Sequence, residues 1–202
     1  RYTSVTGVQT CALPIYDAPG SDGTRGPAQP PLTTTAKAGE LTGRLPQARR
    51  QAAVEGVSKV VDGWFDAAFT EPSYPHQGFA DAFPGFTAGA RRAAEQDVDQ
   101  LTSAAVAEDI TGLTATRRTV TVDLLATRGV ARTATARIRF DYVTTGDEEV
   151  TRSVRGRLLL THGEDGWTVF GYDVVQGRLK GTPRPPGSPS ASPSLSASGS
   201  DS

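Results

Sequence analysis

The strongest constraint on the fold is an alternation of apolar and polar residues between residues 117 and 177. In the first run of this region, Val120, Val122 and Leu124 are separated by polar residues, and a second run alternates in the same way from Ala134 to Tyr142. A period of two places the apolar residues on one side of a β-strand. Two further apolar runs follow, so the region predicts four strands of a sheet with one buried face.

Short turn-forming segments separate these four runs. They are Arg128-Gly129, Thr145-Gly146-Asp147 and Gly163 to Gly166. Glycine adopts positive φ without steric cost, and aspartate bonds to its own backbone, so both residue types favour tight turns. Connections this short join neighbouring antiparallel strands. The region therefore predicts an antiparallel meander.

Two helices are predicted before the meander. Apolar residues recur at spacings of three and four from Leu45 to Thr70, and Pro46 suits the first turn of a helix there. Thr87 is the expected N-cap of a second helix that runs to about Leu101, with a short helical piece after it. Helices followed by a meander are typical of the α+β class. We predict N-terminal helices packed on a curved four-stranded antiparallel sheet.

Composition divides the chain into four segments. Residues 5–15, VTGVQTCALPI, resemble a translated sequencing-library adapter, so residues 1–16 are expected to be an artefact. Residues 17–44 are rich in Pro, Gly and Thr and predict a disordered linker, and residues 179–202 predict a disordered Pro/Ser-rich tail. Residues 45–178 remain as one domain. The true start is expected upstream of this sequence, together with any signal or anchor.

The order and size of the elements over about residues 45 to 178 resemble the nuclear-transport-factor-two-like superfamily. The segments PGFTAGARRAAEQDVDQLT (84–102) and DGWTVFGYDV (165–174), with the Pro-rich linkers, are similar to uncharacterised actinobacterial envelope proteins of that superfamily. The resemblance implies a cone-shaped sheet whose concave side is filled by helices. It also implies an extracytoplasmic domain, secreted or membrane-anchored through an N-terminal segment that this sequence lacks.

Charge and metal-binding residues limit the classes of function. The formal net charge of -1 argues against a nucleic-acid binder, which usually has a marked basic excess. The histidines are His76 and His162, and the single cysteine, Cys11, lies in the adapter-like segment. A His/Cys metal site is therefore not expected. No glycine-rich phosphate loop follows a strand, and we expect no cofactor.

Candidate pocket residues follow from the resemblance. Ketosteroid isomerases and polyketide cyclases of this superfamily use an acidic base inside the cone and tyrosine donors, which implies a ligand-binding cone mouth. The candidates by residue type are Asp62, Asp66, Tyr74, His76, Asp81, Tyr142, Tyr172 and Asp173. Of these, Tyr74, His76, Asp81 and Tyr142 are the ones expected at the mouth of the pocket. The alternative is that they form a polar loop and the wall of the core. Asp62 and Asp66 share one helical face away from the apolar stripe, so we expect them to be solvated.

Four arginines lie on the polar face of the predicted sheet. If the turn at 144–149 closes a hairpin, Arg137 lies opposite Arg157 and Arg139 lies opposite Arg155. Opposed like charges destabilise a sheet, so something must offset them. One interpretation is an anionic partner, such as a lipid head group, a wall polymer or an acidic protein surface. The other is pairing with neighbouring carboxylates, for which the candidates are Asp123, Asp141, Glu148 and Glu149.

The leading hypothesis is a non-catalytic extracytoplasmic domain that binds or scaffolds at the cell envelope, where its partner is an envelope component or protein. The alternative is a small-molecule-binding or isomerase-like protein with an open cone pocket. That alternative requires an acid inside the cone, and a concave side filled by Trp64, Phe69, Ile138 and Phe140 would count against it. A third hypothesis is a homodimer formed through the outer face of the sheet.

Overall fold

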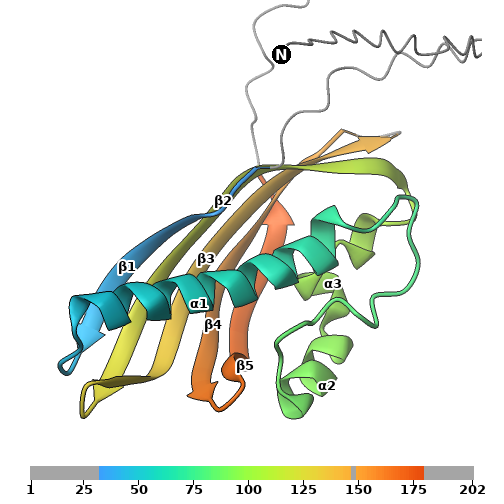
Figure 1. Ribbon diagram of the computed structural model, residues 1–202. Coiled ribbons are helices and arrows are strands. Elements are labelled where there is room, and N and C mark those ends of the chain that lie inside the picture. Colours follow the sequence, from blue (N-terminus) through green and yellow to red (C-terminus); the bar gives the residue numbers. More distant parts are fainter. Residues whose placement is uncertain (1–31, 147–148, 180–202) are drawn as a thin grey trace, which may run out of the picture. The chain divides into compact units, whose positions relative to one another are not determined.

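The computed structural model describes residues 32–146 and 149–179, which form a five-stranded sheet with helices on one face (Figure 1). The adapter-like segment, residues 17–31 of the predicted linker, Glu148 and the tail beyond residue 179 lie outside this range. The elements in chain order are β1 (Thr35–Thr42), α1 (Gln47–Phe65), the π-helical turn η1 (Asp66–Thr70), α2 (Ala88–Gln96), α3 (Val98–Leu101), the 3-10 turn η2 (Ala104–Val106), β2 (Ile110–Thr127), β3 (Val130–Gly146), β4 (Thr151–Gly163) and β5 (Gly166–Arg178).

The predicted four-stranded antiparallel sheet with helices before it is wrong. The sheet has five strands in the order β1-β2-β3-β4-β5, and β1 runs parallel to β2, so the sheet is mixed. The first element of the described chain is therefore a strand and not a helix. It lies in the segment 17–44, for which the sequence predicts a linker.

The composition of β1 explains why the sequence pattern does not show it. Its residues, TAKAGELT, include one large apolar side chain, Leu41, and it pairs on one side only, with β2. The register shifts between Ala38 and Leu41. At this irregularity the Glu40 backbone N–H donates to the Asp123 carboxylate at 2.8 Å, and Arg50 donates to the Gly39 carbonyl at 2.6 Å. Backbone pairing and these two polar contacts, rather than an apolar face, hold β1.

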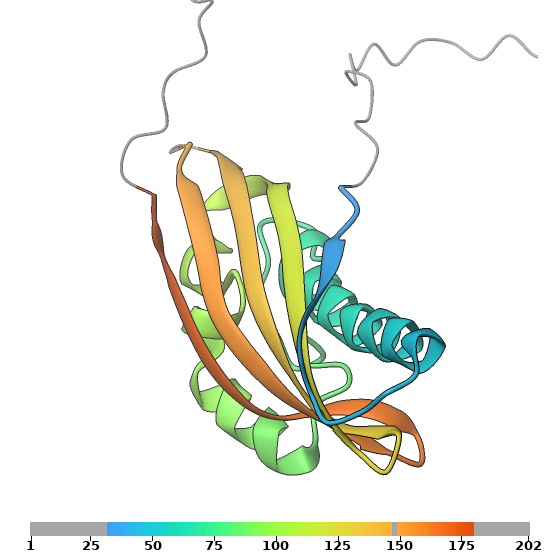
Figure 2. The same ribbon diagram turned by 90° about the vertical axis from the view of Figure 1, so that its left-hand side faces the viewer.

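The order and register of β2 to β5 follow the predicted meander. These strands pair antiparallel with their sequence neighbours, and the β2–β3 turn has positive φ at both Arg128 and Gly129. Register shifts interrupt β2 at three places and the β4–β5 pair at one. Irregularities of this kind bend strands and increase their twist. Figure 2 shows the bent strands with the helices on one side, which we call the inner face, and the other side, the outer face, uncovered.

Helix α1 lies across the inner face and buries a continuous stripe against it. Val57, Val61, Trp64 and Phe65 are fully buried, and the Trp64 indole donates to the Leu101 carbonyl at 3.1 Å. The predicted helix from 45 to 70 therefore exists, although its last turn is the π-helical η1. The second predicted helix also exists, with the Thr87 side chain accepting from the Ala90 N–H, but it breaks at Asp97 into α2 and α3.

Candidate functional site

The inner face of the sheet is packed with aromatic side chains. Phe65 stacks on Phe140 with ring centroids 4.8 Å apart, and Phe69 contacts both Phe140 and Tyr142. The four residues that would fill a closed cone are all buried: Trp64, Phe69 and Phe140 are 0% exposed and Ile138 is 5% exposed. Side chains, not a ligand cavity, therefore occupy the centre of the inner face.

One charged group enters this inner face from β2. Arg118 is 8% exposed, and its guanidinium contacts Asp66 at 2.7 Å and Asp62 at 3.3 Å, while its plane lies over the Phe65 ring at 5.5 Å. The two carboxylates are about one-third exposed, at 34% and 38%. Thr34, just before β1, accepts from Arg118 at 3.0 Å and donates to Asp62. The network joins the residue just before β1 to α1, η1 and β2.

The prediction that Asp62 and Asp66 are simply solvated is therefore wrong, because both pair with a buried cation. Sequence reasoning did not single out Arg118. A signal was present: Arg118 occupies the same alternating frame as Val120 and Val122, so it is a charge in an apolar register. A cation on a buried face requires partners, and carboxylates on the covering helix are the residues that can supply them.

Of the predicted cone-mouth residues, Tyr74 and Tyr142 come together. The Tyr74 hydroxyl contacts the Ser103 hydroxyl at 2.7 Å and donates to the Phe69 carbonyl at 2.6 Å. Burial raises the pKa of Tyr74, although the Ser103 bond opposes the shift. Burial also raises the pKa of Tyr142, where the charge of Arg152 opposes the rise and the neighbouring Tyr74 adds to it. Both hydroxyls thus stay protonated at neutral pH.

The other two predicted cone-mouth residues do not join this pair. The His76 ring meets Phe79 edge-on with centroids 4.9 Å apart, and its backbone N–H donates to the Ala107 carbonyl. Asp81 is exposed. The four candidates therefore do not form one constellation of acid, base and donor.

Sequence reasoning missed a group of polar side chains beside Tyr142. Arg152 on β4 is paired directly opposite Tyr142, and Gln176 lies on the adjoining strand β5, opposite Val154. The Tyr142 hydroxyl, the Arg152 Nε and both polar atoms of the Gln176 amide are buried, and no hydrogen bond to them is formed within the described residues. Buried polar atoms of this kind are usually satisfied, so this corner is a polar weakness of the inner face.

On the outer face, three arginines gather around a single buried carboxylate. The register pairs Arg137 with Arg157 and Arg139 with Arg155, as the sequence predicts. Asp141 is 5% exposed and pairs with Arg139 at 3.0 Å and Arg117 at 3.5 Å. Ser153 donates to Asp141 at 2.5 Å and accepts from Arg155 at 2.9 Å. We call Asp141, Ser153, Arg117, Arg139 and Arg155 the Asp141 cluster.

The two remaining arginines of the predicted patch each have a carboxylate of their own. Arg137 pairs with Asp123 at 2.9 Å and Arg157 with Asp173 at 2.9 Å, both on exposed parts of the outer face. Carboxylates thus offset part of the positive charge, as expected if the arginines pair with neighbouring carboxylates. The outer face still carries five arginines against three aspartates in these contacts, so a positive excess remains at the Asp141 cluster.

A large apolar side chain lies exposed beside this charge. On the edge strand β5, Val175 is 62% exposed and is paired opposite Arg155. A hollow of about 270 Å³ adjoins it, lined in part by Ser153, Arg155 and Val175. The outer face therefore combines excess cations with exposed apolar surface, which is typical of interaction surfaces.

Comparisons with models of protein families, with curated proteins and with solved structures found no match for this chain. The resemblance to the nuclear-transport-factor-two-like superfamily thus stays a prediction. Within residues 32–146 and 149–179, none of the helices has the length and apolar character needed to cross a membrane.

Proposed function

We propose that this chain is a non-catalytic binding domain that acts outside the cytoplasm at the cell envelope and contacts an anionic partner through the Asp141 cluster. The observation that carries the non-catalytic part is the packed inner face, where Trp64, Phe69 and Phe140 occupy the space that a substrate would need. Binding is then left to the surfaces of the domain. The envelope location rests on the resemblance to actinobacterial envelope proteins.

The chemistry of an isomerase finds little support in the described residues. Their one buried carboxyl group is that of Asp141, which lies on the outer face among arginines rather than inside the core. Asp62 and Asp66 are engaged by Arg118. A catalytic base must reach a bound substrate, and neither position offers one a place to bind.

The Asp141 cluster is suited to phosphate or carboxylate groups. A planar guanidinium offers paired N–H donors that match both kinds of anion. Asp141 and Ser153 hold Arg139 and Arg155 in place, so part of the entropy cost of ordering these side chains is met before a partner binds. The exposed Val175 would add apolar contact at the edge of the interface.

The test is sedimentation of the full chain with isolated actinobacterial cell envelopes, at low and at high salt. We expect binding that weakens with salt, because exposed charge pairs are screened. An Arg139→Gln/Arg155→Gln double variant is expected to bind roughly tenfold more weakly, since charge-assisted contacts are lost. The matched control is Arg44→Gln/Arg92→Gln, which removes the same charge from exposed positions outside the cluster.

Two outcomes would overturn the proposal. Equal loss of binding in both double variants would show that net charge, and not the Asp141 cluster, drives the association. A complete gene with no hydrophobic segment before residue 17 would contradict the envelope location. Light scattering on the purified chain without envelopes tests the third hypothesis. A dimer formed through the outer face would cover the Asp141 cluster, so the Arg139→Gln/Arg155→Gln variant should then have the mass of a monomer.

A further inference from the structure

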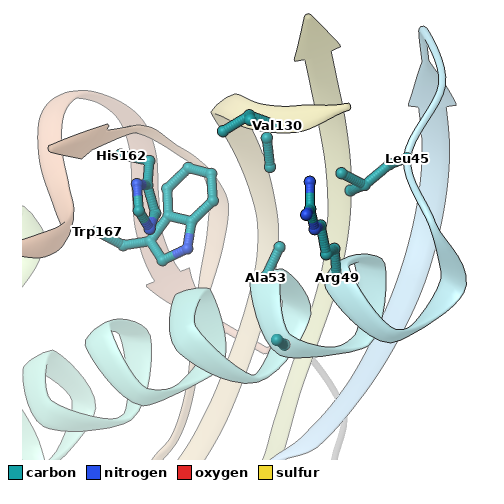
Figure 3. A pocket seen from close by; sticks show the side chains of 8 residues that line it. Leu45, Arg49, Ala53, Val130, His162 and Trp167 are labelled. Carbon is teal, nitrogen blue, oxygen red and sulfur yellow. The ribbon is translucent and has the colours of Figure 1, made fainter. Parts of the chain in front are cut away.

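A second pocket lies on the inner side of the sheet, where the first turns of α1 pass the β2–β3 and β4–β5 turns. Its volume is about 410 Å³. Figure 3 shows His162 and Trp167 on one side of the opening, with Leu45 and Arg49 on the other. The pocket shares no residue with the Asp141 cluster, so a ligand bound in it is independent of the proposed function.

The floor and walls of this pocket are apolar and firmly held. Leu45, Ala53 and Val130 contribute aliphatic surface, and Trp167 is 8% exposed. Trp167 packs against α1 at Gly56, where a Cβ atom would lie 2.8 Å from the indole ring. A side chain at position 56 would therefore displace the ring. The His162 ring meets Trp167 edge-on, with centroids 5.0 Å apart.

One cation stands at the rim without an acidic partner among the described residues. The Arg49 Nη1 donates to the Gly129 carbonyl at 2.8 Å, which fixes the guanidinium beside the pocket. No carboxylate of residues 32–146 and 149–179 forms an ion pair with Arg49. Its remaining N–H groups are available to an acceptor, in contrast with Arg118, whose donors are taken by Asp62, Asp66 and Thr34.

We propose that this pocket binds a small aromatic carboxylate. Its ring would lie against Trp167 and His162, and its carboxylate would pair with Arg49. The volume falls within the range of small-molecule sites, roughly 300 to 1,000 Å³. Aromatic rings pack favourably against aromatic neighbours, and the arginine fork matches a carboxylate. An apolar wall with one oriented cation thus selects a molecule that has one apolar and one anionic end.

The first measurement uses naphthalene-2-carboxylate with the full chain and follows the two indole N–H signals in a ¹H–¹⁵N spectrum. The Trp167 signal is expected to shift as the probe is added. The Trp64 signal is an internal control and should not move, because Trp64 is fully buried and bonded to the Leu101 carbonyl. If the Trp167 signal does not shift at the highest soluble concentration of the probe, the proposed site is wrong.

Variants and a neutral probe then test the chemical class. Arg49→Gln is expected to lower the affinity for naphthalene-2-carboxylate roughly tenfold, because a charge-assisted contact is lost. The matched control Arg92→Gln changes an exposed residue of α2 and should leave the affinity for the probe unchanged. Neutral 2-naphthylmethanol should bind wild type and Arg49→Gln equally and weakly. If the neutral probe binds wild type as tightly as the carboxylate does, the pocket has no anion preference and the proposal is wrong.

A variant that fills the pocket tests the site independently of Arg49→Gln, so the test does not depend on how that variant folds. Ala52 lines the pocket from an exposed helical position, so Ala52→Trp should block the opening without disturbing the core. The new indole at position 52 adds a third N–H signal, which is absent from the wild-type spectrum. We expect the probe no longer to shift the Trp167 signal, while the Trp64 signal keeps its wild-type position. Undiminished binding to Ala52→Trp would place the ligand elsewhere and overturn the proposal.

Discussion

The two faces of the sheet carry their charges in opposite proportions. On the inner face, one buried cation, Arg118, is shared by two carboxylates. On the outer face, one buried carboxylate, Asp141, is shared by Arg117 and Arg139 and reaches Arg155 through Ser153. In the inner network, Asp62, Asp66 and Thr34 accept from the guanidinium of Arg118, so this network stabilises the fold. The outer network has more arginines than carboxylates, so it can also bind an anionic partner.

The largest effect is expected from breaking the inner network. Arg118→Met leaves Asp62 and Asp66 without their cation, and the loss of hydrogen bonds between charged groups costs about 1.5–3 kcal/mol of unfolding free energy. Urea denaturation measures the loss. The control is Arg137→Met, whose pair with Asp123 is exposed at the arginine and should cost less than about 1 kcal/mol. Equal losses in the two variants would contradict the structural role assigned to Arg118.

The second effect separates stability from binding at the outer network. Asp141→Asn removes the carboxylate that offsets the arginines, and we expect a loss of about 1–2 kcal/mol, because charged hydrogen bonds are lost. The same variant should bind actinobacterial envelopes more tightly, because the positive excess rises while the asparagine oxygen can still accept from Arg139 and Ser153 still holds Arg155. Urea denaturation and envelope sedimentation measure the two changes. A fall in both quantities would mean that the cluster needs its aspartate to position the arginines for binding.

The contrast between β1 and the other strands shows what a sequence pattern can predict. The meander and the Arg137–Arg157 register follow from alternation, because each of those strands buries one apolar face. Strand β1 has no such face and is held by backbone pairing and by the Asp123 carboxylate at Glu40. Such contacts join residues more than eighty positions apart, so the local periodicity of the sequence does not predict them.

The site residues divide in the same way. Residue type and alternation point to the outer arginines, since their opposition depends on the strand register, whereas Tyr142 is a candidate through the superfamily resemblance. Strand pairing alone brings Arg152 opposite Tyr142 and Gln176 opposite the neighbouring Val154, and the pocket at Arg49 depends on where α1 crosses two turns. Tertiary packing places those residues together, so their sequence positions alone do not indicate a site.

A smaller effect distinguishes two tyrosines of the inner side. Tyr74→Phe loses the bonds to Ser103 and the Phe69 carbonyl, so it should cost about 1 kcal/mol. Tyr142→Phe removes a buried hydroxyl that has no partner among the described residues, so its stability should change little or increase. Thermal unfolding of the two variants makes the comparison. A loss for Tyr142→Phe as large as that for Tyr74→Phe would indicate that its hydroxyl has a partner, such as water or a ligand.

The smallest effect is an alkaline one and again concerns the inner face. Burial raises the pKa of Tyr172 to about 12, and the Asp97 carboxylate, which accepts from its hydroxyl at 2.8 Å, adds to the shift. An unfolded tyrosine ionises near pH 10, so between about pH 10 and 12 the folded chain holds more protons and its stability falls as pH rises.

Tyr172→Phe removes this contribution and should make that decline shallower, while it costs less than about 1 kcal/mol at neutral pH because the bond is exposed. Urea denaturation at pH 8 and at about pH 11 measures the slope. Part of the decline should persist in the variant, because the pKa values of Tyr74 and Tyr142 are raised as well. The outer arginines keep their charge through this range. A decline unchanged in Tyr172→Phe would contradict a contribution from Tyr172.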